Sequence, residues 1–410
     1  MCHENVDVSP DAYRDLPADF EQKHRSVWVD LPFWEVADPV QAGQYYNWTL
    51  DELIYAARAG FDGVCVNEHH QNAYGFMANP NLMGAVLARA TNGLDVALVQ
   101  LGATLVSSSP PTRIAEEYAM LDCISGGRVV AGLPLGSAMD ASFCIGIPPM
   151  EHRERYREAH DLVLKAWTAR EGFPWNGRYY QLPMVNLWPR PIQTPHPPVW
   201  VPGFGSLSTW EFCAQHNHCY SFLSYYGGQF GKRVMDSFWE FIEEKNLDRN
   251  PYRAGFLQLV VVSETDARAE EEYFPHIKYF FDKGLHVPLE YQAPPGYQDY
   301  RSMVNTMSIA AGPMQEFLVE RPRYRFQDYV DRGIVIGGSP ATVRDRLKEL
   351  VKSLNVGNLM VLLQIGSMPH ELTLKNIDLF AREVLPHIRG IWDDQWENHW
   401  WPAKLRARRP

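Results

Sequence analysis

Short apolar runs alternate with amphipathic stretches along most of the chain. In the segment 60–105, an apolar run at 62–67 is followed by a helical period from Asn79-Pro80 to Gly93, and then by a near-continuous apolar run at 94–106. Such runs are typical of strands buried on both faces, and the period between them indicates helices that cover a parallel sheet. The alternation predicts eight strands, at residues 25–34, 62–67, 94–106, 128–135, 198–201, 219–225, 254–262 and 358–365.

Local signals mark the ends of the helices. Thr49 and Glu52 have the spacing of a capping box, and Asn79-Pro80 places a capping side chain before a proline. Glycines at 60 and 93 close the first two helical periods. We predict helices at residues 49–60, 79–93, 110–123, 151–168, 209–216, 230–245, 266–282, 340–354 and 371–388.

This order predicts a (β/α)8 TIM barrel, as a single domain over residues 1–410. The rival is a doubly wound open sheet, but the glycine fingerprint that follows the first strand of that fold does not occur. Residues 1–24 have no clear period and are expected to form an N-terminal extension. Residues 284–332 interrupt the alternation and are expected to be an insertion or a mobile lid. The tryptophan-rich segment 391–410 is expected to form a C-terminal arm, packed on the barrel or on a partner subunit.

Composition narrows the class of protein. Of 410 residues, 46% are hydrophobic and 21% are charged, which is typical of a globular protein with a sizeable core. The net charge of −11 argues against nucleic acid as a partner. No run approaches the ~20 apolar residues of a membrane span, and the six cysteines form no CxxC pair. We therefore expect a cytoplasmic protein without a redox dithiol.

The predicted strand ends carry the candidate chemistry, because barrel enzymes place their sites there. These ends are mostly aromatic, apolar and glycine-rich, which suggests a cavity for a large flat ligand and an apolar substrate. One carboxylate–imidazole cluster, Glu68-His69-His70, stands among them. The aromatic residues expected to line the pocket are Phe33, Trp34, Tyr225 and Tyr226.

Three interpretations of Glu68-His69-His70 stay open on the residues alone. Histidine is a common metal ligand, but neighbouring strand residues point to opposite faces, so no metal is expected here. The histidines could simply form hydrogen bonds in the barrel rim. Alternatively, one imidazole faces the cavity and donates or accepts a proton.

Two further patterns allow both a structural and a functional interpretation. A strand leads into the turn Gly203-Phe-Gly-Ser-Leu-Ser208, whose glycines, serines and following helix could bind an anion. The same turn could be an ordinary capped helix start. His152 and Tyr156 share one helix face, either as a ligand-binding pair or as an ordinary structural pair.

Taken together, three segments resemble the bacterial luciferase-like flavin monooxygenases. They are GFDGVCVNEHHQNAYGFMANP from Gly60, SPPTRIAEEYAMLDCISGGRVVAG from Ser109, and PRPIQTPHPPVWVPG from Pro189. The resemblance resumes at Gly338-Ser-Pro-Ala-Thr and runs to Ile388. Matching order and spacing over this much chain make the resemblance specific.

The resemblance implies a (β/α)8 barrel and a two-component monooxygenase. A separate reductase would supply reduced FMN, and reaction with O2 would give a C4a-peroxyflavin that inserts one oxygen atom into a hydrophobic small molecule. A homodimer is also implied. The alternatives are an F420-dependent oxidoreductase that transfers hydride, and a non-catalytic flavin-binding subunit.

Residue by residue, the resemblance implies that His69 is the active-site histidine, with Glu68 and His70 orienting it. It implies a cis peptide at Gly102-Ala103 under the flavin ring. The expected phosphate-side residues are His152, Tyr156, Gly205, Ser206 and Ser208.

One departure concerns the phosphate. Pro134 and Leu135 stand where luciferase has a reactive cysteine and an arginine. One phosphate counter-charge is therefore missing, and His152, Tyr156 or an unidentified basic residue must replace it.

Overall fold

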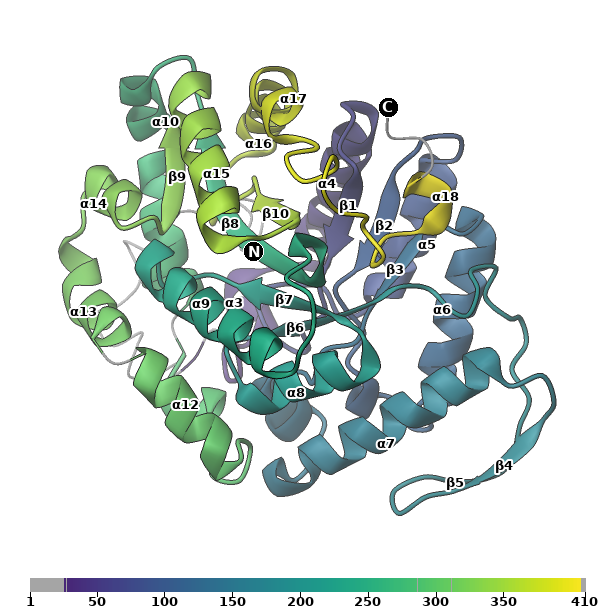
Figure 1. Cartoon of the computed structure of the whole chain (residues 1–410). Coiled ribbons are helices and arrows are strands. Elements are labelled where there is room, and N and C mark those ends of the chain that lie inside the picture. Colours follow the sequence, from purple (N-terminus) through teal and green to yellow (C-terminus); the bar gives the residue numbers. More distant parts are fainter. Residues whose placement is uncertain (1–25, 27, 286, 311, 407–410) are drawn as a thin grey trace.

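The computed structural model describes residues 26, 28–285, 287–310 and 312–406. Its centre is an eight-stranded sheet in the order β1-β2-β3-β6-β7-β8-β10, with β9 paired to β8. Every ladder in this sheet is parallel. Helices surround the strands (Figure 1). The predicted TIM-barrel architecture is therefore confirmed.

The central strands are β1 Gly63–Val66, β2 Ala97–Gln100, β3 Val129–Gly132, β6 Val199–Gly203, β7 Cys219–Leu223, β8 Ala254–Val262, β9 Val335–Gly338 and β10 Asn358–Leu362. An antiparallel hairpin, β4 Phe173–Asn176 and β5 Gln181–Val185, stands apart from them. The longer helices are α4 Pro39–Arg58, α5 Pro80–Ala90, α6 Thr112–Ser125, α7 Pro149–Thr168, α8 Leu207–His216, α9 Gly228–Glu244, α10 Asp266–Tyr279, α12 Tyr300–Ala310, α13 Pro313–Glu320, α15 Pro340–Leu354 and α16 His370–Leu379. The shorter ones are α3 Phe33–Val36, α11 Leu289–Gln292, α14 Phe326–Asp331, α17 Leu385–Ile388 and α18 Ala403–Arg406.

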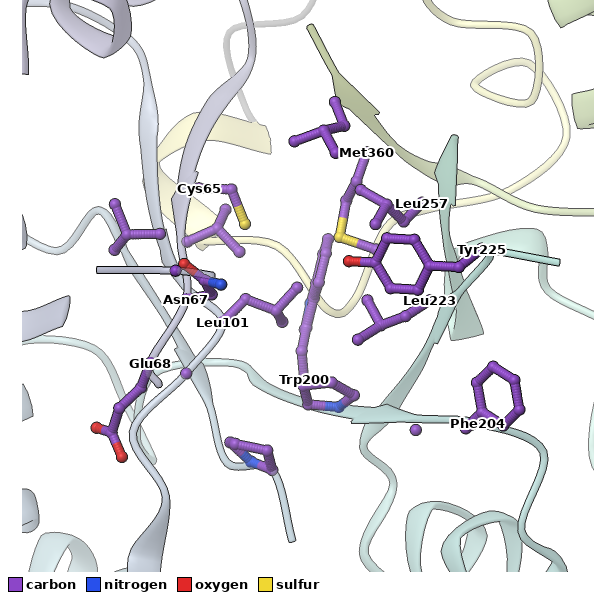
Figure 2. Close-up of a pocket in the computed structure, with 18 of the residues that line it drawn as sticks. Cys65, Asn67, Glu68, Leu101, Trp200, Phe204, Leu223, Tyr225, Leu257 and Met360 are labelled. Carbon is purple, nitrogen blue, oxygen red and sulfur yellow. The ribbon is translucent and has the colours of Figure 1, made fainter. Parts of the chain in front are cut away.

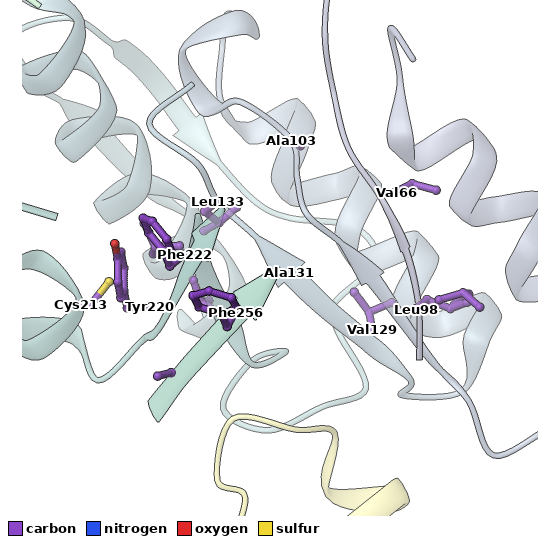
Figure 3. Close-up of a cluster of buried hydrophobic side chains, with 14 of the residues drawn as sticks. Val66, Leu98, Ala103, Val129, Ala131, Leu133, Cys213, Tyr220, Phe222 and Phe256 are labelled. Carbon is purple, nitrogen blue, oxygen red and sulfur yellow. The ribbon is translucent and has the colours of Figure 1, made fainter. Parts of the chain in front are cut away.

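The main hydrophobic core joins the strands to the helices. Leu98 and Val129, from neighbouring strands, belong to one cluster of buried side chains with Phe222 and Phe256 on the other side of the barrel (Figure 3). All four side chains are inaccessible to solvent. Burial of aliphatic and aromatic side chains contributes about 1.5–3 kcal/mol each, so this cluster stabilises the strand ends that carry the candidate site.

The predicted first strand, at 25–34, is wrong. Among its described residues, the Asp30 side chain accepts a hydrogen bond from Ser26 N at 2.8 Å and closes a turn. Pro32 then precedes helix α3. The eighth strand is instead β9, which was not predicted because Val335–Gly338 is only four residues long and directly follows the irregular insertion.

The wall of the barrel is open on one side. Within the described part of the chain, no ladder joins β10 to β1. The main cavity passes through this opening and reaches Glu52 on α4 and Thr373 on α16.

Two other predicted boundaries differ from the structure. Helix α4 begins at Pro39 rather than Thr49, because the Asp38 carboxylate caps it with hydrogen bonds from Val40 N and Gln41 N. Strand β2 ends at Gln100, well before the predicted 106. A cis peptide follows at Leu101-Gly102, and the chain turns away from the sheet there.

The insertion at 284–332 is largely helical and includes α11, α12, α13 and α14. Its residues 292–298, with Met303 and Met307, form one wall of the main cavity. The described part of the segment therefore covers the C-terminal ends of the strands. Its movement as a lid stays a prediction.

The tryptophan-rich segment packs on the barrel. Trp400 and Trp401 are buried and cluster with Trp200, Val99 and Tyr252 near the N-terminal ends of the strands. Trp200 Nε1 donates to Trp400 O at 2.8 Å. The N-terminal extension at 1–24 and the last four residues lie outside the described residues. None of the described helices is both long enough and apolar enough to span a membrane.

Candidate active site

A cavity of about 1080 Å³ opens at the C-terminal ends of the strands and continues into the barrel. Apolar and aromatic side chains line most of it. Cys65, Leu101, Trp200 and Met360 converge on its centre, and Tyr225 closes one side (Figure 2). A cavity of this size and lining suits a large flat ligand together with a small apolar molecule.

His69 lies in the cavity wall just after β1, where Asp140 holds it. The His69 Nδ1 atom is 2.9 Å from Asp140 Oδ2. Asp140 also accepts hydrogen bonds from His70 N at 2.7 Å and from the Ser137 hydroxyl at 2.6 Å. An ionised carboxylate only accepts, so the pattern assigns the proton to Nδ1 and leaves Nε2 for a ligand.

The environment of Asp140 favours the ionised carboxylate. Its side chain is 3% exposed, and burial alone would raise its pKa. The contacts from His69, His70 N and Ser137 outweigh burial and hold the pKa of Asp140 below its usual range. A charged, fixed partner for His69 results. Asp140 was not predicted from the sequence, because it lies 71 positions from His69, in a short helical turn after β3.

The structure corrects the expectation that Glu68 and His70 orient His69. Glu68 Oε1 is 3.1 Å from His70 Nε2, and it accepts a hydrogen bond from Thr104 N at 3.2 Å. In Figure 2 the Glu68 carboxylate points away from the centre of the cavity. The hydrogen bond from His70 to Glu68 raises the pKa of His70. This pair therefore ties the end of β1 to the loop after β2.

The expected cis peptide lies one residue earlier than predicted, at Leu101-Gly102 rather than Gly102-Ala103. Gly102 lines the cavity, whereas Ala103 is buried behind it and donates its N–H to Tyr118 Oη at 3.2 Å. A Cβ on Gly102 would come within 2.1 Å of Gly132 O. Only glycine allows the ends of β2 and β3 to approach this closely.

The glycine–serine turn joins β6 to α8 and adjoins the insertion. Gly205 has a φ of +88° and donates its N–H to Tyr220 Oη at 3.0 Å. Ser206 lines the cavity, and its hydroxyl lies 3.0 Å from the hydroxyls of both Ser208 and Ser302. Ser302 in turn donates to Asp299 Oδ2 at 2.8 Å. A carboxylate of the insertion thus lies beside the predicted anion site.

His152 and Tyr156 lie behind the cavity wall, and neither is among the described residues that line the cavity. Tyr156 donates its hydroxyl to Leu133 O at 2.7 Å. His152 is fully buried, and burial lowers its pKa to about 4. Neither side chain is therefore placed to supply a positive charge to a ligand in the cavity.

Arg153, the next residue on α7, does line the cavity. Its side chain is 17% exposed, and its Nε atom has no hydrogen-bond partner among the residues described. Asp299 Oδ2 lies 3.9 Å from Nε, beyond hydrogen-bonding distance. Arg153 is therefore a candidate for the unidentified basic residue that the resemblance called for. The sequence gives no signal that singles it out, because Arg153 is one of several neighbouring charged residues on the predicted helix 151–168.

The four expected pocket aromatics separate into two groups. Tyr225 and Tyr226 line the main cavity, and the Tyr74 hydroxyl donates to the Tyr225 hydroxyl at 3.2 Å. Phe33 lines a smaller pocket of about 340 Å³, and Trp34 is 75% exposed. The expectation for Phe33 and Trp34 is wrong because it depended on a strand that is not formed.

Comparisons with known proteins agree with this fold. A family model described as luciferase-like monooxygenase matches residues 31–355. The oxygenase component of a flavin-dependent trigonelline monooxygenase from Acinetobacter baylyi is 25% identical over 338 residues, which are 77% of this chain and 92% of that protein. An uncharacterized protein, y4wF, of Sinorhizobium fredii is 35% identical over 144 residues, but the match covers 35% of this chain and 41% of that protein.

Two solved structures share the fold at low identity. The FMN complex of the oxygenating constituent of 3,6-diketocamphane monooxygenase, from Pseudomonas putida, has a TM-score of 0.64 at 20% identity, covering 84% of this chain and 93% of that one. An F420-dependent secondary alcohol dehydrogenase has a TM-score of 0.60 at 17% identity, covering 84% of this chain and 95% of that one.

The family model covers residues 31–355, a stretch that includes the three sequence segments, strands β1 to β9 and His69. It confirms the resemblance drawn from those segments and the expectation of a monooxygenase. The chain belongs to the luciferase-like monooxygenase family.

Proposed function

We propose that the chain is the oxygenase component of a two-component, FMN-dependent monooxygenase that inserts one oxygen atom from O2 into an apolar small molecule. The observation that carries this proposal is that one cavity contains both a histidine held by a buried carboxylate and a half-buried arginine whose Nε has no hydrogen-bond partner among the described residues. The histidine, His69, can donate or accept a proton, and the arginine, Arg153, can bind a phosphate.

The phosphate end of FMN would lie against Arg153 and Ser206. A guanidinium with a vacant donor favours a phosphate oxygen, because a hydrogen bond to a charged group contributes about 1.5–3 kcal/mol. The turn between β6 and the start of α8 adds a hydroxyl and the positive end of a ten-residue helix. The cavity of about 1080 Å³ leaves room for the ring system and a substrate.

Bound reduced FMN would supply the electrons and the atom at which O2 is activated. His69 would keep a proton on Nδ1 against Asp140 and present Nε2 to the ligand, so that a proton can be held or delivered there. Tyr225, Leu223 and Leu257 would pack against the apolar substrate. The insertion would exclude water and so protect the activated oxygen from wasteful loss.

The test supplies reduced FMN from an added NADH-dependent flavin reductase, with ¹⁸O2 and a panel of apolar ketones, terpenes and N-heteroaromatic compounds. We expect a product that carries one ¹⁸O atom and whose formation requires both FMN and this chain. His69→Ala should greatly lower product formation while FMN binding is retained.

Two outcomes would contradict the proposal. Oxidation of an alcohol with reduction of F420, without uptake of O2, would identify a hydride-transferring enzyme. FMN binding without turnover of any compound in the panel would favour a non-catalytic flavin-binding subunit. The expected reductase partner and homodimer are part of the same proposal, and sedimentation of the chain with and without reductase measures both.

A further inference from the structure

Three histidines meet outside the flavin cavity, between helices α7 and α8, which lie side by side in Figure 1. His160 comes from α7, His216 is the last residue of α8, and His218 precedes β7. One ring nitrogen from each lies within 4.8 Å of the other two. His160 Nε2 and His218 Nε2 are 2.8 Å apart. None of the three lines the main cavity.

The end of α8 explains why His216 and His218 face the same way. Asn217 between them is left-handed, with a φ of 53°, and terminates the helix. His218 N then donates to Cys213 O at 2.9 Å and closes the helix end. The rings of His216 and His218 are stacked, with centroids 5.6 Å apart and planes inclined by 17°. The ring of His160 lies across both of them.

The contact with Asp161 leaves a lone pair on His160 Nε2, which points to the middle of this cluster and accepts a hydrogen bond from His218 Nε2. Asp161 Oδ1 is 3.2 Å from His160 Nδ1, which places the proton on Nδ1 and directs the Nε2 lone pair at His218. Neutral imidazole is the form that binds metals, and a carboxylate on the far nitrogen is the usual outer partner of a metal-binding histidine.

We propose that His160, His216 and His218 bind one divalent transition-metal ion, for which Zn²⁺ is the best match. Three imidazoles satisfy the preference of Zn²⁺ for nitrogen ligands at about 2.0–2.1 Å in a tetrahedron. Small rotations of the rings would bring three nitrogens that already lie within 4.8 Å of one another to such distances. His216 is half-exposed, so water can reach the fourth position.

The ion would link α7 to the α8–β7 unit, and its role would be structural. No metal was predicted from the sequence. This cluster could not be recognised there, because His160 and His218 are 58 positions apart and no short spacing motif joins all three residues. The site is separate from the flavin cavity and does not depend on the proposed function.

The experiment titrates Zn²⁺ into tag-free, chelator-treated full-length protein by calorimetry, and follows tetrahedral Co²⁺ by its visible absorbance. We expect one ion per chain and a melting temperature that rises with Zn²⁺. Loss of an outer hydrogen-bond partner weakens metal binding about 10–100-fold. His216→Ala removes a ligand, so Zn²⁺ binding should weaken by more than this, and Zn²⁺ should no longer raise the melting temperature. His399→Ala, which changes an exposed histidine of the arm, should bind like the wild type.

Asp161→Asn provides a second variant with an exposed side chain, for use if His216→Ala does not fold. It should weaken Zn²⁺ binding about 10–100-fold without removing a ligand. The proposal is overturned if the wild type binds no Zn²⁺ at micromolar concentrations. It is equally overturned if the folded His216→Ala variant, or Asp161→Asn in its place, keeps wild-type affinity, because the ion then binds elsewhere. In that case the His160–His218 contact is an ordinary hydrogen bond.

Discussion

At the scale of single residues, Asp140 and Arg153 differ in how completely their charges are compensated. Asp140 is almost fully buried and is compensated by His69, His70 N and Ser137. A buried carboxylate is tolerated only with such partners. Arg153 is compensated less completely, because its closest anion, Asp299, lies 3.9 Å away. The first residue is therefore a positioning group, and the second is available to a ligand.

Asp140→Asn should lower the rate of substrate oxygenation about 100-fold, the lower range for a misplaced acid–base group. The amide keeps the shape but loses the charge that holds His69 Nδ1–H. Product formed per NADH consumed, together with released hydrogen peroxide, measures the effect, and FMN affinity should not change. Ser137→Ala removes one of several hydrogen bonds to the same carboxylate but keeps its charge and its contact with His69, so the loss should be smaller than in Asp140→Asn. Wild-type turnover in Asp140→Asn would show that His69 needs no carboxylate.

Arg153→Gln should weaken FMN binding about 10–100-fold and leave riboflavin binding unchanged, because only FMN carries the phosphate. Quenching of flavin fluorescence gives both dissociation constants. Arg157→Gln, an exposed arginine on the same helix, is the matched control and should change neither. Equal losses for FMN and riboflavin would mean that Arg153 acts on the ring or on the fold rather than on the phosphate.

At the scale of elements, contacts between distant segments shape the cavity. The insertion brings Asp299 and Ser302, near the start of α12, to the serines at the start of α8. On the opposite side, Glu52 of α4 contacts His370 of α16, with Oε1 and Nδ1 2.9 Å apart. Each contact involves a carboxylate at the cavity margin, Asp299 in the first and Glu52 in the second. Replacing each carboxylate by the corresponding amide tests its role.

Asp299→Asn should tighten FMN binding about fivefold, because it removes the repulsion between the Asp299 carboxylate and the phosphate. Two unit charges ~4 Å apart in water repel each other by about 1 kcal/mol. Asp299 is 41% exposed and lies where it would repel a phosphate beside Arg153 and Ser208. Glu320→Gln removes the same charge from an exposed position of the insertion and serves as the control. Weaker FMN binding in Asp299→Asn would mean that this carboxylate orders the site rather than competing for it.

Burial raises the pKa of Glu52 from 4.5 to about 7. The folded state therefore holds a proton that the unfolded state releases, and the free energy of unfolding falls as pH rises from 4.5 to about 7. Relative to Glu52→Gln, the wild type should lose up to about 3 kcal/mol of stability over this range. Urea unfolding at several pH values measures the difference. Asp51→Asn, an exposed neighbour, should show no such trend, and a pH-independent difference for Glu52→Gln would contradict the prediction.

At the scale of the whole molecule, the two ends of the barrel have different tasks. The C-terminal ends of the strands meet the insertion at the mouth of the cavity, whose inner part reaches Trp401 of the arm. The N-terminal ends are covered by the tryptophan-rich arm, in which Trp401 lies 5.9 Å from the ring of Trp200. The arm is therefore expected to contribute to stability, and the insertion to activity.

Trp401→Ala should lower the free energy of unfolding by about 3–5 kcal/mol, the usual cost of removing a buried tryptophan. Trp34→Ala is the matched control, since this side chain is 75% exposed and should change stability by less than about 0.5 kcal/mol. Denaturant unfolding compares the two. A small effect of Trp401→Ala on the free energy of unfolding would mean that other contacts hold the arm. If Trp34→Ala instead greatly lowers activity, Trp34 contributes to the substrate pocket after all.

The sequence by itself determined the architecture and predicted where the candidate site lies. Apolar runs that alternate with helical periods predict a parallel sheet wrapped by helices, since these signals depend only on neighbouring positions. The same local information predicted β8 with its observed boundaries and placed His69 at the end of a strand. It failed at residues 25–34, where Asp30 and Pro32 shape the chain after an apparent strand start.

Only the tertiary structure decided which side chains act on one another. Asp140 reaches His69 across 71 positions, and Ser302 reaches Ser206 across 96. No periodicity encodes such contacts, because they depend on the register of neighbouring strands and on the path of the insertion. For the same reason, only the structure places the cis peptide at Leu101-Gly102. Only the structure shows that Arg153, among the charged residues of its helix, has an Nε without a hydrogen-bond partner among the described residues. Burial also depends on the tertiary structure. It shifts the pKa values of acidic and basic side chains, and a buried charged group needs a partner.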